Sequence, residues 1–298
     1  MIHQLDPFTE PEEAANRRGP LRKIILGSTP VLPVIVTLCN GVAGFISIHY
    51  ATKGGLGGLS SGHLSVAAWL IFAAMFFDAM DGRVARMTRQ ATDFGAQLDS
   101  LCDVISFGVA PAILMLHTVS RTREITEFEM FEAHPSLGKL VLAVAVIYAC
   151  CAVLRLARFN VENAPDLLHH MGFRGLPSPA AAALVASVVL VFNWLLTLEH
   201  GRWLQITVGV ALPAVTLAAA LLMVSRFPYP HLANQFLSRR KPFSTIVVVV
   251  VLMAAGLMFL PTSLAVATMI FAAFGPVTAI YRRFRPAATD EAEDEDLP

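Results

Sequence analysis

Long apolar segments separated by short polar ones set the plan of this chain. Eight of them have about the length of twenty residues that an α-helix needs to cross a bilayer. They lie near residues 29–52, 64–86, 96–119, 137–159, 177–198, 204–224, 243–260 and 263–281. The pattern predicts an all-α polytopic membrane protein with about eight transmembrane helices.

Basic residues divide unevenly between the two sides that these spans define. If the N-terminus is cytoplasmic, 17 of the 22 Lys and Arg residues fall on the cytoplasmic side and five on the other. Short cytoplasmic loops of membrane proteins carry such an excess of positive charge. The distribution therefore predicts that both termini lie in the cytoplasm, and that the connection between the second and third spans faces the cytoplasm.

Composition agrees with a membrane protein and narrows the function. Of the 298 residues, 55% are hydrophobic and 15% charged, and the mean hydropathy is +0.62. This is too apolar for a soluble domain of this size. The formal net charge is zero, so bulk charge does not point to a nucleic-acid partner. The four cysteines lie in apolar segments without metal-binding spacing, and we expect them to pack as small core residues.

Candidate chemistry is concentrated in Asp78–Asp103, which reads DAMDGRVARMTRQATDFGAQLDSLCD. Asp78 and Asp81 are three residues apart and Asp99 and Asp103 are four apart, so each pair shares one face of its helix. In two antiparallel helices joined by the polar residues between them, the pairs lie at matching depth. Four carboxylates this close repel one another, and Mg²⁺ and Mn²⁺ prefer oxygen ligands of this kind. The spacing predicts a site for two divalent metal ions.

The residues beside these acids suit a phosphorylated ligand. Gly82 and Ala85 leave one face of the second span nearly bare, so that a flat or bulky group can lie against it. Arg86 offers a guanidinium fork for phosphate. Metal and phosphate ligands together indicate phosphoryl-group chemistry. The alternative is a solvated helix hairpin held by salt bridges, which is disfavoured because four acids on two membrane helices are costly.

The spacing of the acidic stretch resembles the signature of the CDP-alcohol phosphotransferases, integral membrane enzymes that make phospholipid head-group linkages. It is Asp-x2-Asp-Gly-x2-Ala-Arg-x8-Gly-x3-Asp-x3-Asp, from Asp78 through Gly95 to Asp103, and all eight fixed positions are present. The resemblance covers 26 residues and concerns the donor rather than the acceptor. It implies a core of six helices, to which the last two spans are an addition.

Three other segments carry polar groups that a membrane helix does not need. They are VTLCNGVAGF, with Thr37 and Asn40, VLRLARFN, with Arg155, Arg158 and Asn160, and FRGLPSPAAA, with Ser178. Arg155 and Arg158 are three apart and share a helix face, so they can bind an anionic group. Snorkelling at a helix end is the simpler account of such a pair. Ser178 suits a helix N-cap as well as a ligand contact.

The strings RLARFN and GLPSPAAA, and less clearly SRFPY at residues 225–229, look like the subgroup of the family that makes phosphatidylserine. This similarity implies transfer of the phosphatidyl group of CDP-diacylglycerol to the hydroxyl of L-serine, with release of CMP. The family resemblance also implies a homodimer. Together with the predicted topology, it implies an active site on the cytoplasmic face of the cytoplasmic membrane.

The resemblance also assigns roles to single residues. One metal ion would be held by Asp78, Asp81 and Asp99, and the other by Asp78, Asp99 and Asp103, with Asp103 also taking the proton of the acceptor hydroxyl. The implied ligands of CDP-diacylglycerol are Asn40, Gly82, Ala85, Arg86 and Thr92. The implied ligands of the acceptor are Arg155, Arg158, Asn160 and Ser178, with one of the two arginines on the serine carboxylate.

Two alternatives remain open to the sequence. The same chemistry could use another acceptor, namely glycerol 3-phosphate, an inositol phosphate or choline, because a phosphorylated acceptor also needs basic residues. A cation transporter lined by the acids is more remote. It predicts acids along several spans, whereas here they gather at one face of two helices.

The predicted organisation has four parts. Residues 1–28 form a cytoplasmic N-terminal segment, 29–228 the six-helix catalytic membrane domain, 229–286 a C-terminal pair of transmembrane helices, and 287–298 an acidic tail. The last eleven residues hold six acids and no aromatic residue, a composition typical of disorder.

Overall fold

The fold consists of helices throughout the part of the chain that the structure describes. This computed structural model describes residues 31–53, 62–88, 93–126, 135–162, 175–197, 202–227, 229 and 260–284. In order, the elements are α2 (Val31–Lys53), α3 (Gly62–Thr88), α4 (Asp93–Asp103), the π-helix η1 (Val104–Val109), α5 (Ala110–Thr126), α7 (Pro135–Glu162), α8 (Ser178–Thr197), α9 (Arg202–Val224) and α12 (Leu260–Phe284). The predicted all-α class is confirmed.

Within the described part of the chain, seven helical segments are long and apolar enough to cross a membrane. They are Pro33–Lys53, Gly62–Gly82, Phe94–Thr122, Ser136–Val161, Ser178–Thr197, Ile206–Val224 and Leu260–Tyr281. The chain is therefore an integral membrane protein, and seven of the eight expected spans are found. The remaining one, near 243–260, lies outside the described residues, as do the N-terminal segment and the acidic tail. The cytoplasmic placement of the termini and the domain boundaries stay predictions.

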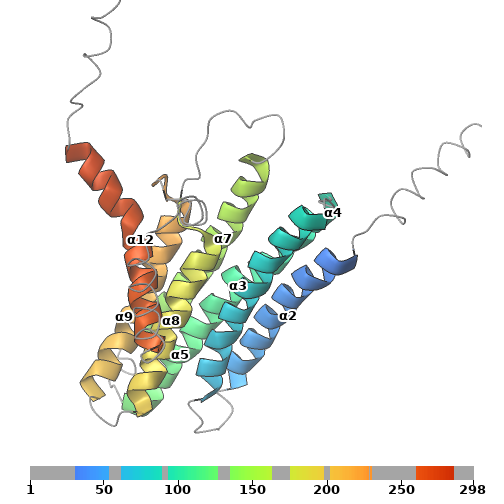
Figure 1. The fold of residues 1–298 in the computed structure, drawn as a ribbon. Helices are drawn as coiled ribbons and strands as arrows, with labels where there is room; N and C mark the ends of the chain where they lie inside the picture. The colour runs from blue at the N-terminus through green and yellow to red at the C-terminus, as the bar shows by residue number, and fades with distance from the viewer. Residues whose placement is uncertain are drawn as a thin grey trace, which may run out of the picture.

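The helices run side by side in one bundle, with α2 and α3 at one edge and α12 at the opposite edge (Figure 1). The central helix is α8, because 72% of its membrane-spanning window is buried, against 17% for α12. A helix that is apolar on every side suits such a position, and α8 reads SPAAAALVASVVLVFNWLLT. Its small residues let neighbouring helices approach closely.

Two glycines bring α2 against the helix that carries Asp99 and Asp103. A Cβ atom added at Gly44 would lie 2.7 Å from Cα of Ser106, and one added at Gly41 would lie 2.9 Å from Sγ of Cys102. Glycine at such points allows helix backbones in a membrane to pack without a side chain between them. The register of α2 against α4 and η1 is therefore fixed by close backbone contact.

The helix that contains Asp99 and Asp103 is interrupted by a π turn. Asp103 ends α4, η1 follows at once, and α5 continues the same rod. A π turn accommodates an extra residue and shifts the carbonyl groups out of the α-helical pattern. The hydroxyl of Tyr148, which is completely buried on α7, donates a hydrogen bond of 3.1 Å to the carbonyl of Phe107 in this turn.

The start of α8 is tied to the end of α9. The Gly175 N–H donates to the carbonyl of Phe227, and the Leu176 N–H donates to that of Leu222, both at 2.9 Å. Gly175 has φ +93°, and a Cβ atom there would lie 2.5 Å from the carbonyl oxygen of Met223, so only glycine fits this turn. We call these two hydrogen bonds the α8–α9 brace.

The helix α12 attaches to this part of the bundle through polar contacts. Ser187 of α8 and Thr268 of α12 share a hydrogen bond of 2.9 Å. The hydroxyl of Tyr229 donates to the carbonyl of Ala272, also at 2.9 Å. Gly275 makes room for the Tyr229 ring, because a Cβ atom there would lie 2.5 Å from the ring.

Candidate metal and substrate site

The two acid-bearing helices bring their carboxylates together at one place. Asp78 and Asp81 lie on α3, and Asp99 and Asp103 lie on α4. Ligand oxygens of Asp78, Asp99 and Asp103 all lie within 4.8 Å of one another. We call these three residues the carboxylate cluster. The helical spacings of three and four place each pair on one face of its own helix, and the tertiary fold brings the two faces together.

Asp81 lies beside the carboxylate cluster rather than in it. Its side chain is only 7% exposed and has the Thr37 hydroxyl and the Asp99 carboxyl as neighbours. Thr37 itself donates to the carbonyl of Pro33 at 3.0 Å. Asp81 Oδ2 and Asp99 Oδ1 are buried and have no hydrogen-bond partner among the described residues.

The donor set of the carboxylate cluster fits a divalent metal ion. Three carboxylates within reach of one cation, with buried oxygen atoms left unpaired, cannot be stable as free anions in a membrane protein. Hard cations such as Mg²⁺ and Mn²⁺ take oxygen ligands of this kind. Asp78, Asp99 and Asp103 can therefore hold a metal, and Asp81 is near enough to Asp99 to extend the set.

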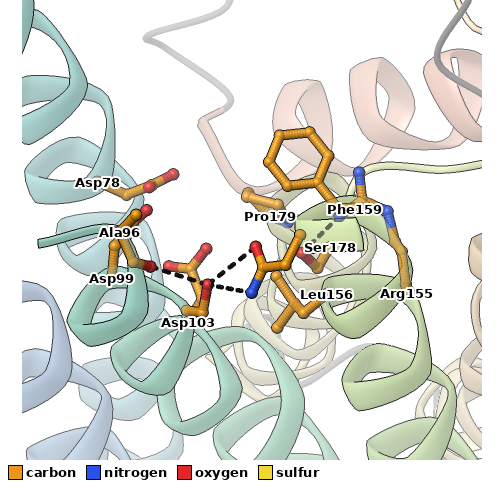
Figure 2. A pocket seen from close by; sticks show the side chains of 11 residues that line it. Asp78, Ala96, Asp99, Asp103, Arg155, Leu156, Phe159, Ser178 and Pro179 are labelled. Atoms are coloured by element: carbon orange, nitrogen blue, oxygen red, sulfur yellow. Dashed lines mark hydrogen bonds between the residues drawn. The ribbon is translucent and has the colours of Figure 1, made fainter. Parts of the chain in front are cut away.

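A cavity of about 280 Å³ adjoins the carboxylate cluster. Its lining comes from α3, α4, α7 and α8 and consists of Asp78, Ala96, Asp99, Ser100, Asp103, Arg155, Leu156, Phe159, Asn160, Ser178 and Pro179. Figure 2 shows the carboxylates on one wall and Arg155, Phe159 and Pro179 on the other. Acids and basic groups from distant parts of the sequence therefore face one space.

Arg155 is held in this wall by Ser178. Its Nη1 donates a hydrogen bond of 2.9 Å to Ser178 Oγ (Figure 2). The first hydrogen bond within α8 runs from the Ala181 N–H to the Pro177 carbonyl, so Pro177 holds the N-cap position and Ser178 is the first helical residue. Arg155 Nε is buried without a hydrogen-bond partner among the described residues, which leaves a donor for an anionic ligand.

The other candidate acceptor ligands separate into two groups. Asn160 lines the cavity, and its amide donates to the hydroxyl of Ser100 at 2.9 Å, which joins α7 to α4. Arg158 is not among the residues that line the cavity. Of the two arginines that the sequence left as equal candidates, the structure brings Arg155 to the carboxylate cluster.

Asn40 lies behind the carboxylate cluster. It is completely buried, and its Nδ2 donates to Asp103 Oδ1 at 2.9 Å. It is not among the residues that line the cavity. The backbone carbonyl of Asn40 accepts a hydrogen bond of 2.9 Å from Ser106 Oγ.

The other expected ligands of CDP-diacylglycerol lie at the end of α3 or beyond it. Gly82 is exposed, and a Cβ atom there would meet nothing within 4 Å, in keeping with a bare helix face. Ala85 and Arg86 belong to α3, but their side chains lie outside the described part of the structure, and Thr92 lies outside it altogether. Their roles in donor binding stay predictions.

Several residues of the cavity were not singled out from the sequence. They are Ala96, Ser100, Leu156, Phe159 and Pro179. The helical period gives a signal for two of them, because Leu156 and Phe159 lie on the same face of α7 as Arg155 and Asn160. Ser100 follows Asp99 directly, but its contact with Asn160 depends on how α4 and α7 pack.

Comparison with known proteins places the chain in a family. The sequence pattern described as CDP-alcohol phosphatidyltransferase matches residues 30–211. The CDP-diacylglycerol–serine O-phosphatidyltransferase of Helicobacter pylori strain 26695 is 34% identical over 202 residues, which are 67% of this chain and 72% of that protein. The protein of the same name from Methanocaldococcus jannaschii is 37% identical over 166 residues, 56% and 64% of the two chains.

A third relative matches over most of its own length. The CDP-diacylglycerol–serine O-phosphatidyltransferase of Bacillus subtilis is 28% identical over 200 residues, which are 67% of this chain and 90% of that protein. The matched region contains the carboxylate cluster and both walls of the cavity. The chain thus belongs to the CDP-alcohol phosphatidyltransferase family and is a membrane transferase of phospholipid synthesis.

Proposed function

We propose that the protein is a CDP-diacylglycerol–serine O-phosphatidyltransferase. It would transfer the phosphatidyl group of CDP-diacylglycerol to the hydroxyl of L-serine and release CMP. The observation that carries this proposal is the cavity shared by the carboxylate cluster and Arg155. The names of the similar proteins from Helicobacter pylori, Methanocaldococcus jannaschii and Bacillus subtilis support serine as the acceptor.

The carboxylates serve the donor in this proposal. Asp78, Asp99 and Asp103 would hold one Mg²⁺ or Mn²⁺ ion, and Asp78, Asp81 and Asp99 would hold a second. When bound, such ions neutralise charge on the diphosphate of CDP-diacylglycerol and make CMP a better leaving group. The unpaired buried oxygens of Asp81 and Asp99 support this assignment, since unpaired anionic groups in a membrane interior need a cation.

Asp103 acts as the general base. Its Oδ1 accepts from Asn40, which leaves Oδ2 for the proton of the acceptor hydroxyl. As that proton moves to Asp103, the hydroxyl oxygen forms a bond to the phosphorus of the phosphatidyl group. The bond from that phosphorus to the CMP oxygen breaks, and CMP departs with the electron pair.

Arg155 binds the carboxylate of serine. Ser178 fixes one of its terminal nitrogens, and the buried, unpaired Nε needs an acceptor, because an unpaired buried donor costs about 1–3 kcal/mol. A carboxylate supplies two oxygens for a guanidinium. Choline has no anionic group to meet this need, whereas glycerol 3-phosphate and inositol phosphate have one.

Acceptor-dependent release of CMP tests the proposed function. Purified protein in detergent, with CDP-diacylglycerol and Mn²⁺ or Mg²⁺, should release CMP with L-serine and form phosphatidylserine, because the cavity pairs the carboxylate cluster with an anion-binding arginine. Release with glycerol 3-phosphate, inositol phosphate or choline instead would keep the chemistry and change the acceptor. No release with any of them, from folded protein, would contradict the proposal.

The Arg155→Lys variant should bind serine poorly. Lysine keeps the charge but loses the guanidinium fork and the geometry that Ser178 fixes. Because a hydrogen bond to a charged group contributes about 1.5–3 kcal/mol, we expect the KM for serine to rise about 10- to 100-fold, with little change in the KM for CDP-diacylglycerol. Steady-state kinetics with each substrate varied in turn measure both constants.

A matched control for Arg155 lies on another helix. Arg121 belongs to the last turns of α5 and does not line the cavity, so Arg121→Lys should leave both KM values within about twofold. The assignment is wrong if Arg155→Lys keeps the wild-type KM for serine. If the KM for serine rises more in Arg158→Lys than in Arg155→Lys, Arg158 rather than Arg155 binds the serine carboxylate.

Two features of the proposal concern the whole molecule. The excess of basic residues on one set of connections supports an active site that faces the cytoplasm from the cytoplasmic membrane. We also propose a homodimer, as the family resemblance implies. Accessibility labelling of single-cysteine variants in intact cells tests the first, and cross-linking in membranes tests the second.

A further inference from the structure

Helix α2 contributes a buried polar contact to the site without lining the cavity. Asn40 is 0% exposed in a membrane-spanning helix, and burying an amide in apolar surroundings is costly unless it is hydrogen-bonded. Its Nδ2 donates to Asp103 Oδ1 at 2.9 Å, whereas its Oδ1 is buried without a hydrogen-bond partner among the described residues. The contact joins residues 63 positions apart in the chain, so it depends on tertiary packing rather than on local sequence.

A second hydrogen bond fixes the backbone of Asn40. Its carbonyl accepts from Ser106, which lies three residues after Asp103 on the same helical rod. One residue of α2 therefore contacts that rod on both sides of the π-turn boundary. The close approach at Gly41 and Gly44 leaves no room for α2 to shift, so the amide cannot follow Asp103 if the carboxyl rotates.

The chemistry of an amide suits this place. An amide N–H can donate a hydrogen bond to one carboxylate oxygen while remaining neutral. It therefore adds no charge to the carboxylate cluster and does not act as an acid. The second oxygen of Asp103 then points in one fixed direction, and a fixed reacting group matters because a misplacement of about 1 Å can cost about 100-fold in rate. A hydrophobic side chain at residue 40 would leave the Asp103 carboxyl free to turn about its χ2 angle.

We propose that Asn40 is a positioning residue that sets the orientation of the Asp103 carboxyl, in place of a direct contact with CDP-diacylglycerol. This inference rests on the proposed role of Asp103 as base and metal ligand. It predicts weaker metal binding and, once the metal ion is saturating, a defect in turnover rather than in the affinity for either substrate. A residue that binds the donor would show the opposite pattern.

The Asn40→Leu variant tests the inference, because leucine has the same number and branching of side-chain heavy atoms as asparagine but no donor. We expect kcat for CMP release to fall about 100-fold, with the KM values for serine and CDP-diacylglycerol within about threefold. Without substrates, we expect the Kd for Mn²⁺, measured by electron paramagnetic resonance on the purified protein, to rise about 10-fold. A wild-type kcat, or a rise confined to the KM for CDP-diacylglycerol, would overturn the inference.

Two further variants separate positioning from folding. Ser106→Ala removes the hydrogen bond to the Asn40 carbonyl and keeps the amide, so kcat should fall by a smaller factor of about 3–10; an unchanged kcat would count against the positioning role of Asn40. Asn193→Leu is the matched control, since Asn193 is also buried but donates to Val189 of its own helix. It should change thermal stability and leave kcat per folded molecule unchanged.

The Mn²⁺ measurement also keeps the inference apart from the proposed function. If the wild-type protein releases no CMP with serine, the proposed function fails. The Kd for Mn²⁺ still decides the role of Asn40 in that case. An equal Kd in wild type and Asn40→Leu would contradict the positioning role even where activity is lost.

Discussion

Asp78→Asn and Asp99→Asn are each expected to abolish CMP release in a protein that still folds and inserts. Each change replaces a negatively charged carboxylate of the carboxylate cluster with a neutral amide. A metal ion contributes several kcal/mol to the stabilisation of transition-state charge, so the rate should fall by at least about 1,000-fold. Because the change also relieves repulsion among buried acids, the thermal unfolding temperature should stay the same or rise.

The measurement combines activity, metal binding and folding. CMP release at saturating substrates gives the rate, Mn²⁺ titration gives the occupancy, and unfolding in detergent shows that the protein is intact. Asp93→Asn is the matched control, because Asp93 belongs to the same helix α4 and comes six residues, or about 9 Å along the helix axis, before Asp99; its activity should stay within about threefold. Normal turnover by Asp78→Asn or Asp99→Asn would refute the metal assignment.

Gly44→Ala is expected to damage both stability and activity, although it adds a single methyl group. The new Cβ would lie 2.7 Å from the Cα of Ser106, a backbone atom that cannot move alone. The two helices must separate, which costs about 1–3 kcal/mol of stability. Separation also draws Asn40 and Ser106 apart and releases Asp103, so we expect the rate of CMP release to fall at least about 100-fold.

The control for Gly44 is a glycine in open surroundings. A Cβ atom at Gly138, in the first turn of α7, would meet nothing within 4 Å. Gly138→Ala should therefore retain full activity and gain up to about 1 kcal/mol of stability, since alanine loses less conformational entropy in a helix. Equal activity in Gly44→Ala and wild type would show that the close approach is not needed for catalysis.

The parts of the site that could be predicted from the sequence are those fixed by local geometry. Spacings of three and four residues place Asp78 with Asp81 and Asp99 with Asp103 on single helix faces, whatever surrounds them. Apolar length alone identifies the spans. For these features the sequence predictions and the structure agree, because neither depends on how distant helices pack.

The contacts between distant helices could not be predicted in the same way. Arg155 and Arg158 share a helix face, and the tertiary fold distinguishes them by the cavity that Arg155 lines and by its hydrogen bond to Ser178 of α8. The family resemblance implies that Asn40 contacts the donor, but the direction of its side chain depends on the approach of α2 to Asp103. The π turn at Val104–Val109 has no recognised sequence pattern at all.

The α8–α9 brace bears on how the enzyme can be shortened. The match to the family pattern ends at residue 211, whereas the carbonyl groups that anchor the start of α8 belong to Leu222 and Phe227. A chain cut at residue 211 would keep all three residues of the carboxylate cluster. It would lose the α8–α9 brace, which anchors the start of α8 and with it Ser178, the partner of Arg155. Since the Tyr229 hydroxyl in turn donates a hydrogen bond to the Ala272 carbonyl of α12, we expect the smallest active unit to extend past residue 211, and a terminal fusion to preserve activity better than a truncation.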